Sequence, residues 1–274
     1  GTQIHKDDGT CVLRGTALVK VLRLTEPVPV PKDAPAMPRI RLLDERTALV
    51  TGSSRGIGRA IARLLAAQGA SVWINYRRSR TAAESLEREI IDRGGKCHLI
   101  GADVTDEADV RRLAEEIGGQ GGLDILVHNA GPRIRSAPFS DLSWSDMSTA
   151  HEEIVGSAFR VTKALLPALK QSKGKIITIL TSASLGRTAH NWLPYVAAKA
   201  ALLAMGKNLA QELGPQGVTV NMISPSMVDT DLTANIPDRV RQAMVSRTPL
   251  RRLATAEDVA GAVLLLASPY ASFI

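Results

Sequence analysis

From residue 43 onward, short apolar runs alternate with longer amphipathic segments. Runs of this length predict buried strands, and apolar residues at helical spacing predict helices between them. The predicted strands are 47–51, 71–75, 97–101, 124–128, 175–180 and 218–223. The predicted helices include 59–68, 81–93 and 107–117, with Gly69 and Gly94 where a C-terminal cap is expected. This strand–helix order predicts a Rossmann-type α/β fold, a doubly wound parallel sheet with helices on both faces.

The first 43 residues follow a different pattern. Residues 2–24 alternate between apolar and polar positions around Asp8-Gly9, as in a β-hairpin. Residues 25–39 hold five of the chain's 14 prolines, a composition typical of an extended linker. We therefore expect a β-hairpin appendage or the remnant of an upstream domain at 1–24, a Pro-rich linker at 25–43 and a dinucleotide-binding domain at 44–274.

The charge and composition of the chain favour some classes of binding partner over others. The chain has 34 Lys and Arg against 27 Asp and Glu, a net +7 that favours a phosphorylated coenzyme, a CoA thioester or an acidic carrier protein. The basic residues are dispersed and match no nucleic-acid-binding motif, so we expect no nucleic-acid partner. Cys11 and Cys97 lack metal-ligand spacing, which predicts no metal site and a reducing cytoplasm. The first ten residues are polar, so we expect no signal peptide. The longest apolar run, 259–267, is too short to span a membrane.

A glycine-rich turn follows the first predicted strand. The sequence from Thr51 to Gly58 reads T-G-S-S-R-G-I-G and opens a helix. Glycine permits a close approach of the backbone to a pyrophosphate, and the helix N-terminus offers it free N–H groups. The residues expected to bind the coenzyme here are Gly52, Ser54, Arg55, Gly56, Ile57 and Gly58.

The end of the second predicted strand bears on the choice of coenzyme. An acidic residue at this point binds the ribose 2′-hydroxyl and selects NAD, but the chain reads Asn75-Tyr76-Arg77-Arg78. Arg55 together with Arg77 or Arg78 can meet a 2′-phosphate through a charged fork. The alternative is that Arg77 and Arg78 are solvated loop charges. We expect NADPH (NADP+) to be preferred over NADH, with Tyr76 and Arg77 at its adenosine end.

A tyrosine and a lysine are the candidate catalytic residues. Tyr195 and Lys199 are four residues apart on a predicted helix, so their side chains share one face. A phenol titrates near pH ~10 alone, and a nearby ammonium favours the phenolate and lowers that pKa. Ser182, thirteen residues before Tyr195, follows the end of a predicted strand. Its hydroxyl can hold a substrate oxygen while hydride reaches the carbon.

These motifs together resemble the short-chain dehydrogenase/reductase family, and within it the 3-oxoacyl-(acyl-carrier-protein) reductases. The resemblance covers about 44–274 and implies that Ser182, Tyr195 and Lys199 are catalytic. It implies an adenine contact by Asp103 and Val104, and a lid over about 226–248. It also implies cofactor-site positions in the N-A-G turn and in the stretch that closes over the nicotinamide, namely Asn129, Ala130, Gly131, Pro225, Val228 and Thr230.

The chain departs from the family pattern at several positions. His128 replaces an Asn, which we interpret as a change of hydrogen bonding at the strand end, and Ser226 replaces a Gly at the lid hinge. Ile154 stands where an Asn normally holds a proton-relay water, and His151 or Glu152 from nearby turns are the candidate substitutes. The family's last strand does not follow Ile274, so we expect the sequence to be a fragment.

The first zone carries a second, weaker resemblance. Residues 8–17, D-G-T-C-V-L-R-G-T-A, are similar to the closing strands of a hotdog-fold dehydratase of the MaoC type. A tag or an ordinary edge hairpin are the alternatives. A truncated dehydratase neighbour would connect the chain to acyl-thioester chemistry.

The function expected from these residues is NADPH-dependent reduction of a ketone, foremost a 3-oxoacyl thioester on an acyl-carrier protein or CoA. Arg133 or Arg135 can meet the carrier phosphate, with loop solvation as the alternative. The rival functions are an NAD(P)+-dependent secondary-alcohol dehydrogenase and a catalytically idle NADP-binding protein. A purely structural fused domain is the third. The family implies a homodimer or homotetramer through long helices at about 146–170 and 195–213.

Overall fold

The computed structural model describes residues 2–5, 11–15, 41–132, 134–186, 189–230 and 238–274. The chain divides into two compact units, Gly1–Arg39 and Ile40–Ile274. In the first unit, β1 (Thr2–His5) pairs antiparallel with β2 (Cys11–Gly15), as the alternation predicts. The Asp8-Gly9 turn and the proline-rich stretch lie outside the described residues. The assignments of 1–24 and 25–43, and the dehydratase resemblance, therefore stay predictions.

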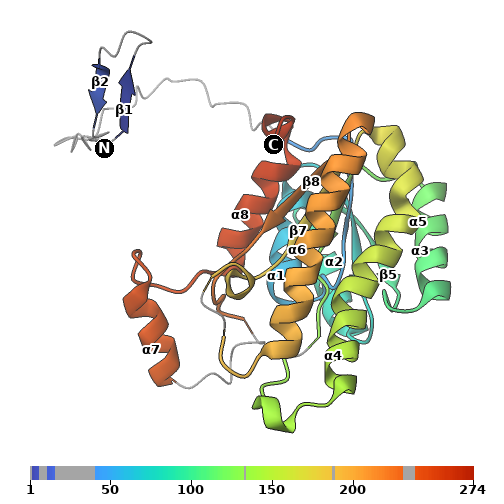
Figure 1. Ribbon diagram of the computed structural model, residues 1–274. Coiled ribbons are helices and arrows are strands. Elements are labelled where there is room, and N and C mark those ends of the chain that lie inside the picture. The colour runs from blue at the N-terminus through green and yellow to red at the C-terminus, as the bar shows by residue number, and fades with distance from the viewer. Residues whose placement is uncertain (1, 6–10, 16–40, 133, 187–188, 231–237) are drawn as a thin grey trace. The chain divides into compact units, whose positions relative to one another are not determined.

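The second unit is built on one parallel sheet (Figure 1). Its described part has six strands in the order β5-β4-β3-β6-β7-β8. The chain thus moves outward from the centre twice, which confirms the predicted doubly wound sheet. Each predicted strand matches the structure to within one residue at either end. The strands are β3 (Thr47–Val50), β4 (Ser71–Tyr76), β5 (Lys96–Gly101), β6 (Ile125–His128), β7 (Lys175–Ile179) and β8 (Thr219–Ile223).

Helices cover both faces of the sheet because its strands are apolar on both sides. In β3, Ala48 and Val50 pack into one buried cluster with α1, α2 and α8, while Leu49 packs into another with α3 and α5. Successive strand residues point to opposite faces, so one short strand supplies both cores. The main helices are α1 (Gly56–Ala67), α2 (Arg80–Asp92), α3 (Glu107–Gly119), α4 (Trp144–His151), α5 (Ser157–Ser172), α6 (Leu193–Leu213), α7 (Asp238–Arg247) and α8 (Ala256–Ala267).

The C-terminal ends of the first two helices lie where the sequence predicts them, whereas the start of α1 differs from its prediction. Gly69 and Gly94 have φ values of +99° and +74°, which glycine adopts without strain, so both expected caps are confirmed. Helix α1 begins at Gly56, three residues before its predicted start, because the glycine-rich turn itself enters the helix. Among the described helices, none is both long and apolar enough to cross a membrane.

The region predicted as one helix at 146–170 is interrupted. A π-helical turn, η2 (Glu152–Gly156), separates α4 from α5. The single extra residue of a π turn leaves the helix axis continuous but shifts the faces that follow, and such turns are frequent at functional sites. Strands of a parallel sheet end on one edge, so the turns after β3, β6 and β7 meet there, next to this interruption.

Candidate active site

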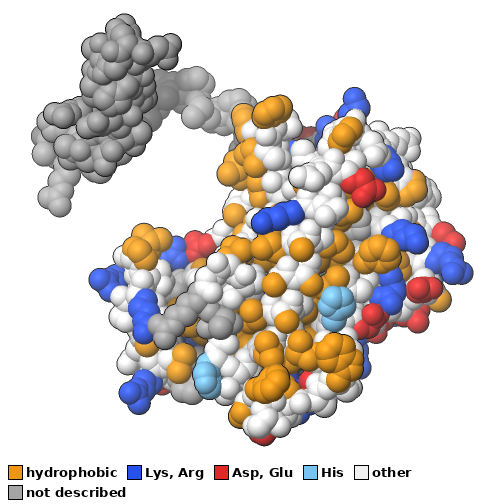
Figure 2. Space-filling view, viewed as in Figure 1, with side chains coloured by type: hydrophobic (Ala, Val, Ile, Leu, Met, Phe, Trp, Pro, Cys, Tyr) orange, Lys and Arg blue, Asp and Glu red, His pale blue; other side chains and the backbone are white. Residues whose placement is uncertain are grey.

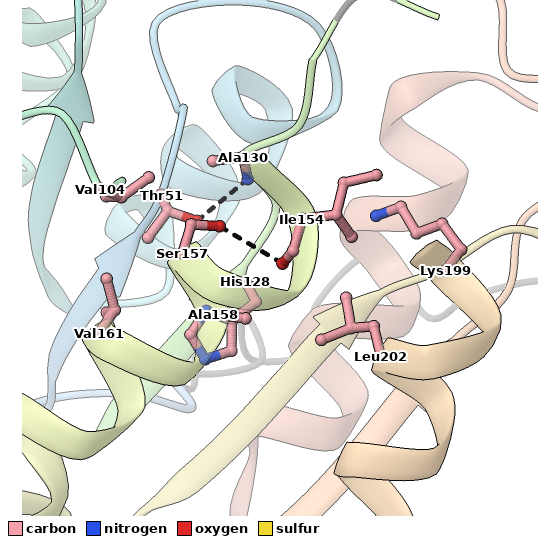
Figure 3. Close-up of a pocket in the computed structure, with 10 residues that line it drawn as sticks. All are labelled: Thr51, Val104, His128, Ala130, Ile154, Ser157, Ala158, Val161, Lys199 and Leu202. Atoms are coloured by element: carbon pink, nitrogen blue, oxygen red, sulfur yellow. Dashed lines mark hydrogen bonds between the residues drawn. The ribbon is translucent and has the colours of Figure 1, made fainter. Parts of the chain in front are cut away.

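Two turns at the carboxyl edge are fastened to each other by hydrogen bonds. The Thr51 hydroxyl oxygen accepts from the backbone N–H groups of Asn129 and Ala130, each at 3.0 Å (Figure 3). The Asn129 side-chain amide donates to the carbonyls of Thr51 at 2.9 Å and Gly52 at 3.1 Å. The glycine-rich turn after β3 and the turn Asn129-Ala130-Gly131 after β6 therefore form one unit.

Glycine is needed in this turn for two different reasons. Gly52 and Gly56 have φ values of +62° and +55°, in the left-handed region that favours glycine. A Cβ on Gly58 would lie 2.5 Å from the Asn129 amide nitrogen and 2.6 Å from the Gly52 carbonyl oxygen. Gly58 thus permits the packing of the two turns, whereas a Cβ on Gly56 would, among the described residues, approach the Thr230 side chain at 3.8 Å.

The start of α1 has the features of an anion site. The extended residue Arg55 precedes the helix and makes no side-chain cap, and the first turn contains no acidic residue. The first amides of the helix and its positive dipole end are therefore available to a pyrophosphate. Ser54 is buried in the turn and Ile57 packs against the core, so we expect both to meet a coenzyme through backbone atoms.

Asn75 is a site residue that sequence reasoning missed. Its side-chain oxygen accepts from the Gly52 N–H at 3.1 Å, and its amide donates to the carbonyls of Ala102 at 3.0 Å and Ile100 at 3.4 Å. Its backbone carbonyl accepts from the Ser53 N–H at 2.9 Å. This buried side chain joins the glycine-rich turn to the end of β5, where the expected adenine contacts begin. A polar residue near the end of an otherwise apolar strand was the available signal.

The adenosine end carries Arg77 and Asp103. Although burial acts in the opposite direction, hydrogen bonds from Thr105 and the charge of Arg77 hold the pKa of Asp103 below its ordinary value. The Arg77 guanidinium lies 3.5 Å from the Asp103 carboxylate and 3.9 Å from that of Glu153. Both are long, partly exposed pairs, which contribute little and leave Arg77 able to turn toward an anion.

The catalytic candidates come from two neighbouring elements. The Lys199 ammonium donates to the Ile179 carbonyl at 2.6 Å and lies 5.8 Å from the centroid of the Tyr195 ring. Ser182 begins a short 3₁₀ turn, η3 (Ser182–Ser184), which packs against α6. Its backbone N–H donates to the Pro225 carbonyl at 2.9 Å, so the serine is tied to the segment after β8.

The expected lowering of the tyrosine pKa is wrong for this structure. Burial raises the pKa of Tyr195 to about 12, and burial lowers the pKa of Lys199 to about 8. Desolvation disfavours the charged form of each group, and it is the cause of both shifts. The phenol is therefore held protonated at neutral pH, as a proton donor, in the state that the structure describes.

The remaining predicted positions lie on the same edge. Val228 is buried and forms an isolated parallel bridge with Ala254, which anchors the base of the predicted lid. Val104 lines a small cavity, and the Tyr76 ring packs against Gly101. Arg135, whose side chain is 59% exposed, forms an ion pair with Asp146, and Arg133 lies outside the described residues.

Residues 52–274 match a family model described as enoyl-(acyl carrier protein) reductase. The chain is 38% identical over 235 residues to the 3-oxoacyl-[acyl-carrier-protein] reductase FabG of Escherichia coli (strain K12), a match that covers 84% of this chain and 92% of that relative. The chain belongs to the short-chain dehydrogenase/reductase family. It is therefore an oxidoreductase, and this family uses NAD or NADP.

Solved structures agree with this membership. A 7α-hydroxysteroid dehydrogenase complexed with NADH and 7-oxo glycochenodeoxycholic acid is 35% identical, with a TM-score of 0.81 over 86% of this chain and 92% of that chain. A short-chain dehydrogenase from Burkholderia cenocepacia J2315 in complex with NADP is 33% identical, with a TM-score of 0.79 over 85% and 94%. One of these structures is a complex with NADH and the other with NADP, so the fold alone does not decide between the two coenzymes.

In this short-chain dehydrogenase/reductase, Ile154 lies inside the π turn and is buried against Leu180 and Leu202. The candidate substitutes do not replace an Asn there: His151 is exposed, and Glu152 forms an ion pair with Arg160. Neither lines the cavity of about 10 Å³ behind Lys199, a volume close to that of one water molecule (Figure 3). The lining residues are Thr51, Val104, His128, Ala130, Ile154, Ser157, Ala158, Val161, Lys199 and Leu202.

His128 does more than alter the strand end. Its ring lines this cavity, and its Nε2 lies 2.7 Å from the Thr162 hydroxyl, which links β6 to α5. Burial, followed by the charge of Lys199, lowers the pKa of His128 to about 4. The imidazole is therefore neutral at physiological pH, and it presents a hydrogen-bonding group in the same cavity as Lys199.

Replacing Asn75 by Ala tests the connection between the two halves of the coenzyme site. The change leaves the Gly52 N–H and two carbonyls without their partner, which corresponds to about a 10-fold increase in the NADPH dissociation constant. The matched control is Asn208→Ala on the exposed surface of α6. Titration of NADPH fluorescence measures both, and equal dissociation constants for the two variants contradict the assignment.

Acid should destabilise the enzyme through His128. Its pKa is about 4 when folded and ~6.5 when unfolded, so the unfolded chain binds more protons as the pH falls through this window. The free energy of unfolding should drop by roughly 2 kcal/mol from pH 7 to pH 4.5 through this residue. His128→Gln removes that part of the drop in urea unfolding, whereas His151→Gln, at an exposed histidine, retains it. Identical pH dependence in both variants refutes the prediction.

Proposed function

We propose that this enzyme reduces a 3-oxoacyl thioester to the 3-hydroxyacyl thioester with NADPH. The observation that carries the proposal is the placement of Tyr195 and Lys199, one helical turn apart beside Ser182 at the edge where the glycine-rich turn opens. The substrate class is supported by the identity to the Escherichia coli 3-oxoacyl-[acyl-carrier-protein] reductase across 92% of that protein.

The residues at the end of β4 support NADPH as the coenzyme. The stretch from Asn75 to Arg78 contains no carboxylate that could bind a ribose 2′-hydroxyl. Within the described part of the chain Arg77 makes only long ion pairs, and Arg55 lies exposed at the start of α1. Two guanidinium groups near one adenosine end favour a 2′-phosphate through charge-assisted hydrogen bonds.

Each catalytic side chain then has one task. Bound NADPH supplies the hydride for the ketone carbon. The Tyr195 hydroxyl donates its proton to the ketone oxygen, and the Ser182 hydroxyl donates a hydrogen bond to the same oxygen. Lys199 supplies positive charge next to the phenol as that proton leaves, which stabilises the forming phenolate.

The same residues can run a secondary-alcohol oxidation, and one solved relative is a hydroxysteroid dehydrogenase. Burial raises the pKa of Tyr195 to about 12, so the phenol is protonated at neutral pH, which is the form that a reduction starts from. The preference for reduction rests on the identity to the 3-oxoacyl-[acyl-carrier-protein] reductase. An idle NADP-binding role, suggested by Ile154, is opposed by the retained tyrosine and lysine pair.

The proposal includes assembly into a homodimer or homotetramer. Support comes from large apolar side chains that stand exposed on the helices expected to pair: Trp144 on α4 is 81% exposed and Phe159 on α5 is 54% exposed. Such side chains on neighbouring helices mark an interaction surface. The proposed cellular compartment is the cytoplasm.

Turnover of an acetoacetyl thioester tests the proposed function. The wild-type enzyme should oxidise NADPH with this substrate faster than NADH, and Tyr195→Phe should lower kcat by roughly 10²–10⁴-fold because the proton donor is lost. Tyr270→Phe, at an exposed tyrosine, is the matched control. NADPH should bind all three proteins equally, since the phenol is not a coenzyme anchor in the proposal.

Two results would contradict this function. Tight NADPH binding without turnover of any ketone would indicate an idle binding protein. Turnover that survives in Tyr195→Phe would show that another group supplies the proton.

A further inference from the structure

More than half of the chain's net positive charge is carried by one exposed segment. Residues 238–252, which we call the lid surface, contain five arginines and a single aspartate, a net +4 of the chain's +7. The lid surface consists of α7 and the five residues that follow it. No residue of α7 is buried, and cationic side chains gather over it in Figure 2. The charge is therefore presented to solvent.

Only part of this charge is neutralised within the chain. Arg241 pairs with Asp229 at 2.9 Å, and Arg252 pairs with Asp258. Across the described ranges, neither Arg239 nor Arg247 forms an ion pair, and the Arg251 guanidinium donates to a backbone carbonyl, that of Ser246. Among the residues that the structure describes, the lid surface therefore holds three guanidinium groups without an acidic partner.

Apolar side chains stand among these arginines. Val240 is 43% exposed, Met244 is 37% exposed and Leu250 is 76% exposed. A site for one phosphate needs a compact set of donors, whereas this surface spreads charge and apolar area over fifteen residues. Mixed arginine, methionine and aliphatic surfaces are typical of protein interfaces, where charge steers the encounter and apolar contacts hold it.

The lid surface lies next to the catalytic edge. In the sequence, the lid surface lies between Val228 and Ala254, which form a parallel bridge with each other. Shortly before Val228, the Pro225 carbonyl accepts a hydrogen bond from the Ser182 backbone N–H. In Figure 1, α7 lies on the side of the sheet where the strands end. A macromolecule bound to α7 is thus positioned to present a tethered acyl group to Tyr195.

We propose that the lid surface docks an acidic acyl-carrier protein that delivers the 3-oxoacyl thioester. This inference rests on the proposed function and adds the place where the carrier binds. Charge complementarity selects the occupant: an acidic protein offers several carboxylates to Arg239, Arg247 and Arg251, while a CoA thioester offers only its phosphates. Arg135, the candidate from the sequence, is already paired with Asp146.

The experiment reverses two charges on α7 and two elsewhere. Arg239→Glu with Arg247→Glu is compared with Arg88→Glu and Arg111→Glu, an equal charge change at exposed positions of α2 and α3. Reduction is followed with acetoacetyl acyl-carrier protein, acetoacetyl-CoA and acetoacetyl-N-acetylcysteamine, which has neither protein nor phosphate. The α7 variant should raise KM for the carrier-bound substrate by roughly 10-fold and weaken its salt dependence, as expected for charges that steer encounter. The kcat/KM of the α7 variant for acetoacetyl-N-acetylcysteamine should stay within ~2-fold of wild type. The control variant should match wild type on all three substrates.

Other outcomes overturn the proposal. An equal loss on all three thioesters assigns the arginines to the catalytic pocket, and an equal loss on the carrier and CoA substrates assigns them to phosphate recognition. No loss, or an equal loss in the control variant, removes the docking role. Fluorescence anisotropy of labelled acyl-carrier protein against the same variants keeps the test independent of turnover. If the wild-type enzyme reduces no thioester, the proposed function fails, and anisotropy still decides whether α7 binds the carrier.

Discussion

The site depends on how the turn after β3 is held against its neighbours at the carboxyl edge of the sheet. Thr51, Asn75 and Asn129 bind this turn from three sides, through backbone groups of β5, β6 and the turn itself. These hydrogen bonds are buried or partly buried, where an unmade bond is costly, so the turn has one well-defined shape. Gly52 and Gly56 adopt the positive φ angles that this shape requires, and Gly58 leaves the space that a Cβ would fill.

The catalytic groups follow from the same edge. Lys199 reaches the carbonyl of Ile179 at the end of β7, and Ser182 is tied to Pro225 after β8. The sheet therefore positions the coenzyme turn and the proton donor by the register of adjacent parallel strands. Burial then sets their chemistry, because it keeps the Tyr195 phenol protonated and brings the pKa of Lys199 to about 8.

Much of the fold could be predicted because buried parallel strands are short apolar runs, and their limits are visible in the sequence. The coenzyme turn and the pair Tyr195 and Lys199 were found through spacing on single elements. Asn75 and His128 were not given their roles, because their partners lie on other elements and only the folded sheet brings them together.

Two further features could not be predicted from the spacing of residues along the sequence. The π turn at 152–156 adds one residue within a helical stretch, which a periodicity of ~3.6 does not resolve. The pKa of Tyr195 depends on its burial, and the local spacing to Lys199 suggested the opposite direction. In both cases the deciding quantity is tertiary, whereas the prediction used neighbours along one helix.

The most direct measurement follows the transferred hydrogen. NADPH deuterated at both C4 positions is incubated with the enzyme and an acetoacetyl thioester, and the product is examined by mass spectrometry. The account predicts a 3-hydroxybutanoyl thioester with a single deuterium on its third carbon. A product without deuterium, or no product although NADPH is bound, would contradict the assignment of this site as a ketone reductase.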